Sequence, residues 1–224
     1  MGMTAKRATF AAAGVLAVTL MVGCIPPPDA PTTTTTSEPR ELLVDQENNP
    51  IEFTYSDGFG LASCGYQDPV RQVMQTFTAG RTGSLERVSL PLYTYVGDPP
   101  PLIVTIHPLL GPGAPDLSVE LGRGTYDGPG LGEYVFQTFS APAELLDITM
   151  ATPAPVVAGS QYALLTRVDL AECDDGQASW AAPTRLGPAD HYLGGAHFYW
   201  NPYASAWVSS TSLPGDEIFQ TWVR

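Results

Sequence analysis

Residues 88–106, VSLPLYTYVGDPPPLIVTI, decide the fold class, because they hold two runs of alternating apolar residues around a loop rich in proline. One face of each run is apolar: Val88, Leu90 and Leu92 in the first, and Leu102, Val104 and Ile106 in the second. Side chains of a β-strand alternate between its two faces, so a period of two predicts strands with one buried face. The glycine and prolines between the runs predict a loop.

The same pattern recurs along residues 42–224, whereas no apolar repeat typical of a helix persists there for three turns. Leu117, Val119 and Leu121 alternate in the same way. Further strand-like segments are Val73–Thr78, 134–139, Gln161–Val168, 197–200, Ala206–Ser209 and 217–223. Glycine and proline, with 22 residues each, punctuate them densely. Eight or more short strands at this spacing predict an all-β protein, a jelly-roll-like two-sheet antiparallel β-sandwich.

The N-terminal residues predict export. Lys6 and Arg7 precede an apolar run over residues 8–23, which is the layout of a signal peptide and is short for a membrane-spanning helix. An uncleaved anchor is the less favoured alternative. The end of this segment, LMVGC at residues 20–24, resembles the lipobox of bacterial lipoproteins, with Met21 where the family prefers leucine. The resemblance implies cleavage after residue 23, lipidation of Cys24, and a protein held at the extracytoplasmic side of a membrane.

Residues 24–40 predict a tether between this anchor and a single domain at residues 41–224. The segment is rich in Pro and Thr and holds a single aliphatic residue, so it has too little apolar surface to fold. Polyproline II structure would give it a reach of roughly 50 Å. Thr32 to Thr36 resemble O-glycosylated tethers of exported actinobacterial lipoproteins, although a plain solvated spacer explains them equally well.

Charge limits the classes of partner. The formal net charge is -13, and removal of Lys6 and Arg7 with the signal peptide leaves eight basic residues against 23 acidic ones, a net of -15. Nucleic acid and anionic bilayers both require a basic face, so neither is expected as the main partner. Attachment to the membrane is therefore expected to depend on the lipid.

Two cysteines remain if Cys24 carries lipid. Cys64 and Cys173 form an even pair in an oxidising compartment, which predicts one disulfide. Two separate thiols are the alternative.

Aromatic residues provide the main candidate site. Six of them, within 28 residues of the C-terminal region, are candidate ligand-binding residues: Trp180, Tyr192, Tyr199, Trp200, Tyr203 and Trp207. Sugar rings stack on indole and phenol rings, and a sandwich can expose such side chains. Alternation along residues 197–200 sends Phe198 and Trp200 to one face and His197 and Tyr199 to the other, so part of the cluster is expected in the core.

Motifs for catalysis are missing from the sequence. It contains no Gly-x-Ser-x-Gly, P-loop, His-Glu-x-x-His or dinucleotide-binding glycine pattern, and no catalytic residue is assigned. A catalytic triad of residues distant in sequence stays possible in principle, because geometry defines it. Asp174 and Asp175 offer oxygen ligands of the kind that calcium takes, but calcium needs six to eight, so a solvated loop is the favoured interpretation.

The order of several segments resembles one family. They are QTFTAG (75–80), TGSL (82–85), VSL (88–90), LIVTI (102–106), VAGSQYA (157–163), Trp180, YLGG (192–195) and FQTWV (219–223). Together they resemble the choice-of-anchor type of bacterial exported β-sandwich. This resemblance covers about residues 44–223 and implies a domain similar to carbohydrate-binding modules, held at the cell surface by varied anchors. The family has no agreed binding residues, and the cysteine pair and the segment 107–133 depart from it.

These observations favour a non-catalytic binding domain on a surface lipoprotein, with a glycan or another envelope component as its ligand. A structural or protein-interaction domain of the envelope that uses its sheet edges is the alternative. A hydrolase is the third and least favoured class.

Overall fold

The computed structural model describes residues 40–49, 56–61, 72–94, 100–132, 144–168, 180–185, 192–209 and 215–224, which belong to one compact unit that spans residues 39–224. None of these residues lies in a helix. The strands are β1 (Leu43–Asn48), β2 (Ser56–Gly60), β3 (Val73–Thr78), β4 (Gly83–Leu90), β5 (Tyr93–Thr94), β6 (Leu102–Gly111), β7 (Ala114–Pro115), β8 (Gly122–Tyr126), β9 (Leu146–Val156), β10 (Gln161–Val168), β11 (Trp180–Arg185), β12 (His197–Asn201), β13 (Ala206–Ser209) and β14 (Phe219–Val223).

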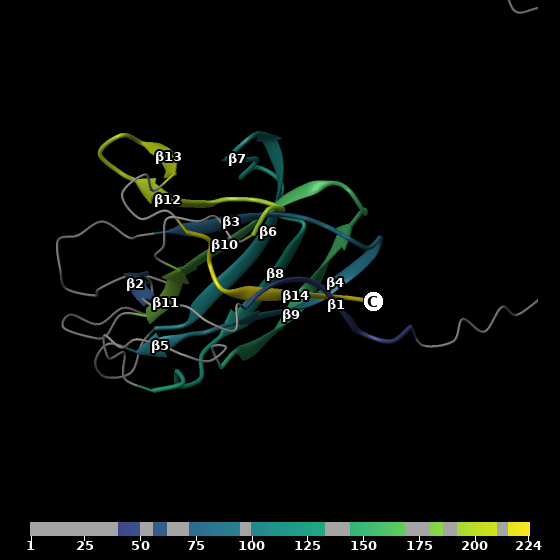
Figure 1. Cartoon of the computed structure of the whole chain (residues 1–224), viewed down its shortest axis with the longest axis horizontal. Coiled ribbons are helices and arrows are strands. Elements are labelled where there is room, and N and C mark those ends of the chain that lie inside the picture. Colours follow the sequence, from purple (N-terminus) through teal and green to yellow (C-terminus); the bar gives the residue numbers. More distant parts are fainter. Residues whose placement is uncertain are drawn as a thin grey trace, which may run out of the picture. The chain divides into compact units, whose positions relative to one another are not determined.

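The long strands form two antiparallel layers. The first has the order β1-β14-β4-β9, and the second has the order β8-β6-β10-β3-β12-β13. Strand β9 belongs to both, because it pairs with β4 and also with β8. The chain passes between layers from β3 to β4 and from β9 to β10, as in a jelly roll. Figure 1 shows β12 and β13 apart from β1, β4 and β14. The predicted jelly-roll-like two-sheet sandwich is confirmed.

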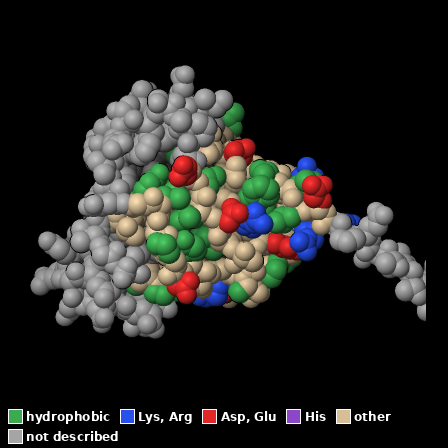
Figure 2. All heavy atoms as spheres, turned by 90° about the horizontal axis from the view of Figure 1, so that it is seen from below, with side chains coloured by type: hydrophobic (Ala, Val, Ile, Leu, Met, Phe, Trp, Pro, Cys, Tyr) green, Lys and Arg blue, Asp and Glu red, His purple; other side chains and the backbone are tan. Residues whose placement is uncertain are grey.

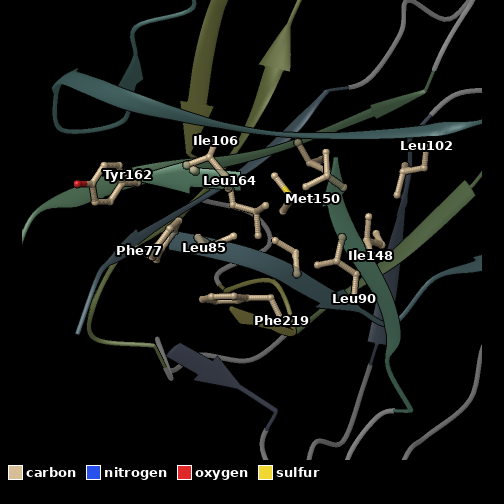
Figure 3. Packing of buried hydrophobic residues seen from close by; sticks show 14 of the residues in the cluster. Phe77, Leu85, Leu90, Leu102, Ile106, Ile148, Met150, Tyr162, Leu164 and Phe219 are labelled. Carbon is tan, nitrogen blue, oxygen red and sulfur yellow. The ribbon is translucent and has the colours of Figure 1, made fainter. Parts of the chain in front are cut away.

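One apolar core lies between the layers. Figure 3 shows Phe77 and Leu164 of the second layer facing Leu85 and Phe219 of the first. The residues predicted to form the apolar faces are fully buried, namely Leu102, Val104 and Ile106 in one run and Val88, Leu90 and Leu92 in the other. Ile103, Thr105 and Ser89 between them are buried as well, so these segments are covered on both faces and not on the predicted single face. Burial of one such side chain in the core contributes about 1.5–3 kcal/mol to stability. The core therefore fixes the second layer as far as β3, which is the strand that pairs with the β12–β13 hairpin.

The segment between β6 and β8 differs from its prediction. Leu117, Val119 and Leu121 do not form a strand, and Leu117 and Val119 are exposed. Asp116 organises a turn instead, since its side chain accepts hydrogen bonds from the Ser118 backbone N–H (3.0 Å) and hydroxyl (2.6 Å). The Val119 carbonyl lies 2.8 Å from Nδ1 of His107. The chain thus folds back beside β6. The hydrogen bonds of the polar turn decide the local structure here, although the apolar residues alternate as in a strand.

Several predicted strands are confirmed at their bounds, namely β3, β10 and β13, while β12 is one residue longer than predicted and β14 begins two residues later. The segment 134–139 lies outside the described residues. The same holds for residues 1–39, with Cys24 and most of the tether, and for Cys64, Cys173, Asp174 and Asp175. A separate small sheet has the order β2-β11-β5.

One face of the sandwich carries charged side chains of both signs. Figure 2 shows one face of the molecule, on which basic side chains lie next to acidic ones. Two such pairs join Arg87 to Asp147 at 2.8 Å and Arg123 to Glu120 at 2.6 Å. Exposed ion pairs contribute at most about 1 kcal/mol each, so they add little to the stability that the core provides.

Candidate functional site

The β12–β13 hairpin brings four of the six candidate aromatic residues together: Tyr199, Trp200, Tyr203 and Trp207. The two strands pair from Phe198 opposite Ser209 to Asn201 opposite Ala206, so Trp200 lies directly opposite Trp207. Trp180 is in β11 of the small sheet, where its backbone pairs with Thr94. It is therefore not part of the hairpin.

Asn201 shapes the hairpin turn. Its side-chain oxygen accepts hydrogen bonds from the backbone N–H groups of Tyr203 (3.0 Å) and Ala204 (3.1 Å), which is an Asx turn. Ser205 completes the turn with a φ of 47°, in the left-handed region. The turn places Tyr203 at the tip, where its side chain is 88% exposed. The amide NH2 of Asn201 has no partner among the described residues.

The two faces of β12 have different surroundings, as the alternation predicts. His197 lies opposite Gln75 on the core side and is buried, and Tyr199 packs against the core. Phe198 points the other way and contacts Gly113 in the β6–β7 turn. Gly113 has a φ of 68°, and a side chain there would overlap the Phe198 ring. The outer face of the hairpin is therefore supported from the side by the β6–β7 turn.

Trp200 and Trp207 form the centre of that outer face. Their ring centroids are 5.7 Å apart at an interplanar angle of 68°, an edge-to-face pair. Both residues are half-buried. Among the described residues, neither indole N–H donates a hydrogen bond. The pair is thus partly exposed, and its two rings contact one another edge to face.

Tyr192 belongs to the core and not to the hairpin surface. It is 7% exposed, its ring packs edge-on against Phe219 at 5.1 Å, and its hydroxyl donates to Oε1 of Gln46 at 2.8 Å. Burial raises the pKa of Tyr192 to about 12, so the hydroxyl keeps its proton at neutral pH. Its ring has no free face for a ligand, which removes it from the candidate binding residues.

The hairpin and the residues on either side of it contain no charged side chain. No Asp, Glu, Lys or Arg occurs between Tyr192 and Gly215, although the chain as a whole has a formal charge of -13. The electrostatic character of this surface is therefore neutral in an acidic protein. A ligand on the hairpin meets aromatic rings, amides and hydroxyl groups.

A buried polar cluster lies beneath the hairpin, and its members come from segments that are distant in the sequence. Glu217 and His197 are 1% and 4% exposed, and Oε1 of Glu217 lies 4.0 Å from Nε2 of His197. Gln75 connects the cluster: its Nε2 donates to Oδ1 of Asp216 at 2.8 Å, and its Oε1 accepts from the Glu217 backbone N–H at 2.9 Å. Asp216 also accepts from the Tyr192 backbone N–H at 3.1 Å.

Burial shifts both titratable partners toward their neutral forms. It lowers the pKa of His197 to about 4, and, together with the nearby charge of Asp216, it raises the pKa of Glu217 to about 8. Perturbed pairs of this kind often occur in active sites. Here both side chains are enclosed, so a substrate does not reach them in this conformation. Only the folded structure brings these residues together, because Gln75 is more than 120 residues away in the sequence.

The described residues contain no group of three or more His, Cys, Asp and Glu side chains that could hold a metal ion. Within the same residues, no helix is long and apolar enough to cross a membrane.

The fold and the hairpin define an antiparallel β-sandwich with an aromatic surface at the end of one sheet. Comparison with protein families finds no match, and comparison with curated proteins finds no similar sequence.

Proposed function

We propose that the protein is an exported, lipid-anchored binding protein that holds an uncharged glycan on the outer face of the β12–β13 hairpin. The observation that carries the proposal is the edge-to-face pair of Trp200 and Trp207, whose indole N–H groups are not used by the described residues. Tyr203, 88% exposed at the tip, extends the same hairpin.

Glycan chemistry fits this surface. A sugar ring presents C–H groups on its faces and hydroxyl groups around its rim, so it needs an aromatic plane and nearby hydrogen-bonding groups. The hairpin supplies half-buried rings, two indole donors and the amide of Asn201. A fixed pair of rings also loses little conformational entropy when it binds.

Charge favours an uncharged polymer over an acidic one. The hairpin has no cationic side chain to pair with a carboxylate or phosphate, and the mature chain, at a net charge of -15, repels polyanions. Lipidation at Cys24 and the tether at residues 24–40 belong to the same proposal, because they would present the domain outside the cell. The resemblance to the choice-of-anchor type agrees with this arrangement.

Titration of tryptophan fluorescence tests the proposal. The mature chain with Cys24→Ala, which stays soluble if the cysteine carries the lipid, is titrated with neutral polysaccharides and with acidic ones of similar length. We expect a saturable change with a neutral polymer only, and its loss in Trp200→Ala and Trp207→Ala. Trp222→Phe is the matched control, since this residue lies on the other layer. A response that survives both hairpin variants would contradict the proposed site.

A protein-interaction domain is the second candidate. Strand β13 ends the order of the second layer, and Leu193 is 92% exposed beside the hairpin, so this edge could accept a strand from another protein. No fluorescence change across the polysaccharide series, together with a partner captured by cross-linking from Ser209→Cys, would favour this candidate.

A further inference from the structure

We propose that Glu217 and His197 form a proton-operated clasp that keeps the β12–β13 hairpin docked on the sandwich, so that pH regulates the ligand surface. The coupling to a ligand rests on the proposed function, whereas the clasp itself rests on the geometry of the described residues.

The hairpin has a short attachment to the rest of the sheet. Strand β12 pairs with β3 through three residues, from His197 to Tyr199, whereas β10 pairs with β3 through six. Two further backbone hydrogen bonds join the hairpin strand to β3 and its flank, from the Trp200 N–H to the Gln72 carbonyl at 2.8 Å and from the Thr76 N–H to the Ala196 carbonyl at 2.9 Å. The Thr76 hydroxyl also accepts from the Ala196 N–H at 2.8 Å. Side-chain contacts at the start of β12 add to this short ladder.

His197 is the side chain at that position. It is the first residue of β12, it points into the core beside Gln75, and Glu217 approaches it from the segment that leads into β14. The pair consequently connects β12 of the second layer to the segment that precedes β14 of the first layer. Separation of the pair would remove the contact that joins the start of the hairpin to the opposite layer.

Glu217 is held rigidly at its backbone, but its carboxyl group is not. Its N–H donates to Oε1 of Gln75 at 2.9 Å, and its carbonyl accepts from Nδ2 of Asn48 at 2.6 Å. Among the described residues, neither carboxyl oxygen has a hydrogen-bond partner. At 4.0 Å the imidazole Nε2 is just beyond hydrogen-bond distance, so a small rotation brings a protonated carboxyl group into contact with it.

The protonation state decides whether this arrangement is stable. The titratable groups that approach Glu217 among the described residues are His197 from β12 and Asp216 from its own segment, while β1 and β3 supply the uncharged Asn48 and Gln75. A neutral carboxyl group can donate a hydrogen bond to a neutral imidazole and keep its proton. An ionised carboxylate adds a second negative charge next to Asp216 in an enclosed site, which is unfavourable.

We therefore expect the hairpin to stay docked at mildly acidic and neutral pH and to loosen as Glu217 loses its proton near pH 8. Undocking separates His197 from the core and hydrates the carboxylate. A ligand that needs the fixed geometry of Trp200 and Trp207 would then be released.

Hydrogen exchange and tryptophan circular dichroism test the clasp without any ligand. Between pH 6 and pH 9 we expect the amides of His197–Tyr199 and Trp200 to lose protection at least tenfold more than those of β10, after correction for the intrinsic pH dependence of exchange. The exciton signal of the Trp200–Trp207 pair should fall over the same range. Glu217→Gln keeps an uncharged group of the same shape and should abolish both changes.

The matched control is Glu47→Gln, a carboxyl group of β1 that accepts from Gln220 at the surface. It should leave the pH response as in the parent. If the hairpin amides stay protected at pH 9 in the parent protein, or if Glu217→Gln loosens in the same way, the clasp is wrong.

Ligand titrations at pH 6 and pH 9 separate this inference from the proposed function. A neutral polysaccharide should bind at least tenfold more weakly at pH 9 to the parent and equally at both pH values to Glu217→Gln. Binding that is equal at both pH values in the parent overturns regulation and leaves the function intact. A pH-dependent hairpin that binds no polysaccharide at pH 6 supports the clasp and overturns the function.

Discussion

Trp222 and the Trp200–Trp207 pair are tryptophans on the outer faces of the two layers, and the protein uses them differently. The indole N–H of Trp222 donates to Oγ of Ser89 at 2.9 Å, and the Arg87 guanidinium lies 5.2 Å above its ring. Trp200 and Trp207 contact each other, and no described residue accepts from their N–H groups. A satisfied indole indicates a structural role, whereas an accessible donor beside a ring face indicates capacity for a ligand.

The network beneath Trp222 extends this contrast. Asp147 accepts from both neighbours of that ring, at 2.6 Å from the Ser89 hydroxyl and 2.8 Å from the Arg87 guanidinium. The Trp222 indole N–H, the Ser89 hydroxyl and the Arg87 guanidinium thus all have protein partners. We therefore expect mutation of Trp222 to lower stability. We expect mutation of Trp200 or Trp207 to change mainly the ligand response or the geometry of the hairpin.

The largest effect is expected where the hairpin joins β3. A Cβ on Gly195 would overlap the Thr76 carbonyl, and the backbones are already bonded there through the Thr76 N–H and the Ala196 carbonyl at 2.9 Å. Gly195→Ala should lower the free energy of unfolding by about 3 kcal/mol, because backbone atoms must move apart. Urea denaturation measures it. Gly111→Ala, with open space around the glycine, is the control and should change stability by less than about 0.5 kcal/mol.

Truncation of the tryptophans should separate the two regions directly. Trp222→Ala loses a half-buried ring, a hydrogen bond and a cation–π contact, so we expect a loss of about 2–3 kcal/mol. Trp207→Ala loses one ring contact on an edge strand, and about 1 kcal/mol is expected. Thermal unfolding of both variants gives the comparison. Equal losses would mean that the hairpin rings are as structural as Trp222.

The buried pair predicts an unusual pH profile of stability. In the unfolded chain Glu217 and His197 titrate near their ordinary pKa values of 4.5 and 6.5, and in the folded protein near 8 and 4. Between pH 6.5 and 8 the folded state keeps a proton on Glu217 that the unfolded state has lost, so stability falls by about 2 kcal/mol as pH rises.

Between pH 4.5 and 6.5 each state holds one of the two protons, on Glu217 when folded and on His197 when unfolded, so the contributions of the pair cancel. Below pH 4.5 stability falls again, because the unfolded state binds both. Glu217→Gln should remove the loss above pH 6.5 and, with only His197 titrating, replace the plateau by a decline below pH 6.5. Urea midpoints of parent and variant over this range check the difference, and parallel profiles would refute it.

The smallest effect is expected for the arginine that covers Trp222. Arg87 and Asp147 are partly solvent-exposed, so Arg87→Ala should cost less than about 1 kcal/mol. Arg123→Ala breaks a similar exposed pair with Glu120 that covers no tryptophan, and a smaller loss is expected. Urea denaturation at low and high salt measures both. Equal losses of stability in the two variants would mean that the contact of Arg87 with the Trp222 ring adds nothing measurable.

Sequence patterning predicted several strands at their bounds. Val73–Thr78, Gln161–Val168 and Ala206–Ser209 match β3, β10 and β13, of which the first two are buried almost throughout and the third is half-buried. Strand β9 was not predicted, since Pro153 and Pro155 suggest a loop. The strand pairs with β4 on one side and with β8 on the other, and both pairings contain register shifts. Such irregularities accommodate the two prolines.

The candidate site was predictable only in part. Alternation placed Trp200 and Tyr199 on opposite faces of one strand, as the structure has them, but it could not show that Tyr192 packs on Phe219 in the core. The contact of Glu217 with His197 depends on Gln75, which comes from a distant strand. Long-range pairing of this kind leaves no local signal in a single sequence.

The position of β1 has a mechanical consequence. Arg40 leads directly into β1, whose first residue pairs with Val223, and in Figure 1 the β12–β13 hairpin lies at the opposite end of the molecule. If the proposed polymer were to pull on the hairpin against the proposed tether that ends at Arg40, the force would load β1 along its length. The hydrogen bonds from β1 to β14 run across that direction, so they resist together in shear and do not break one by one. The short first strand would then act as the force-bearing joint of an anchored domain.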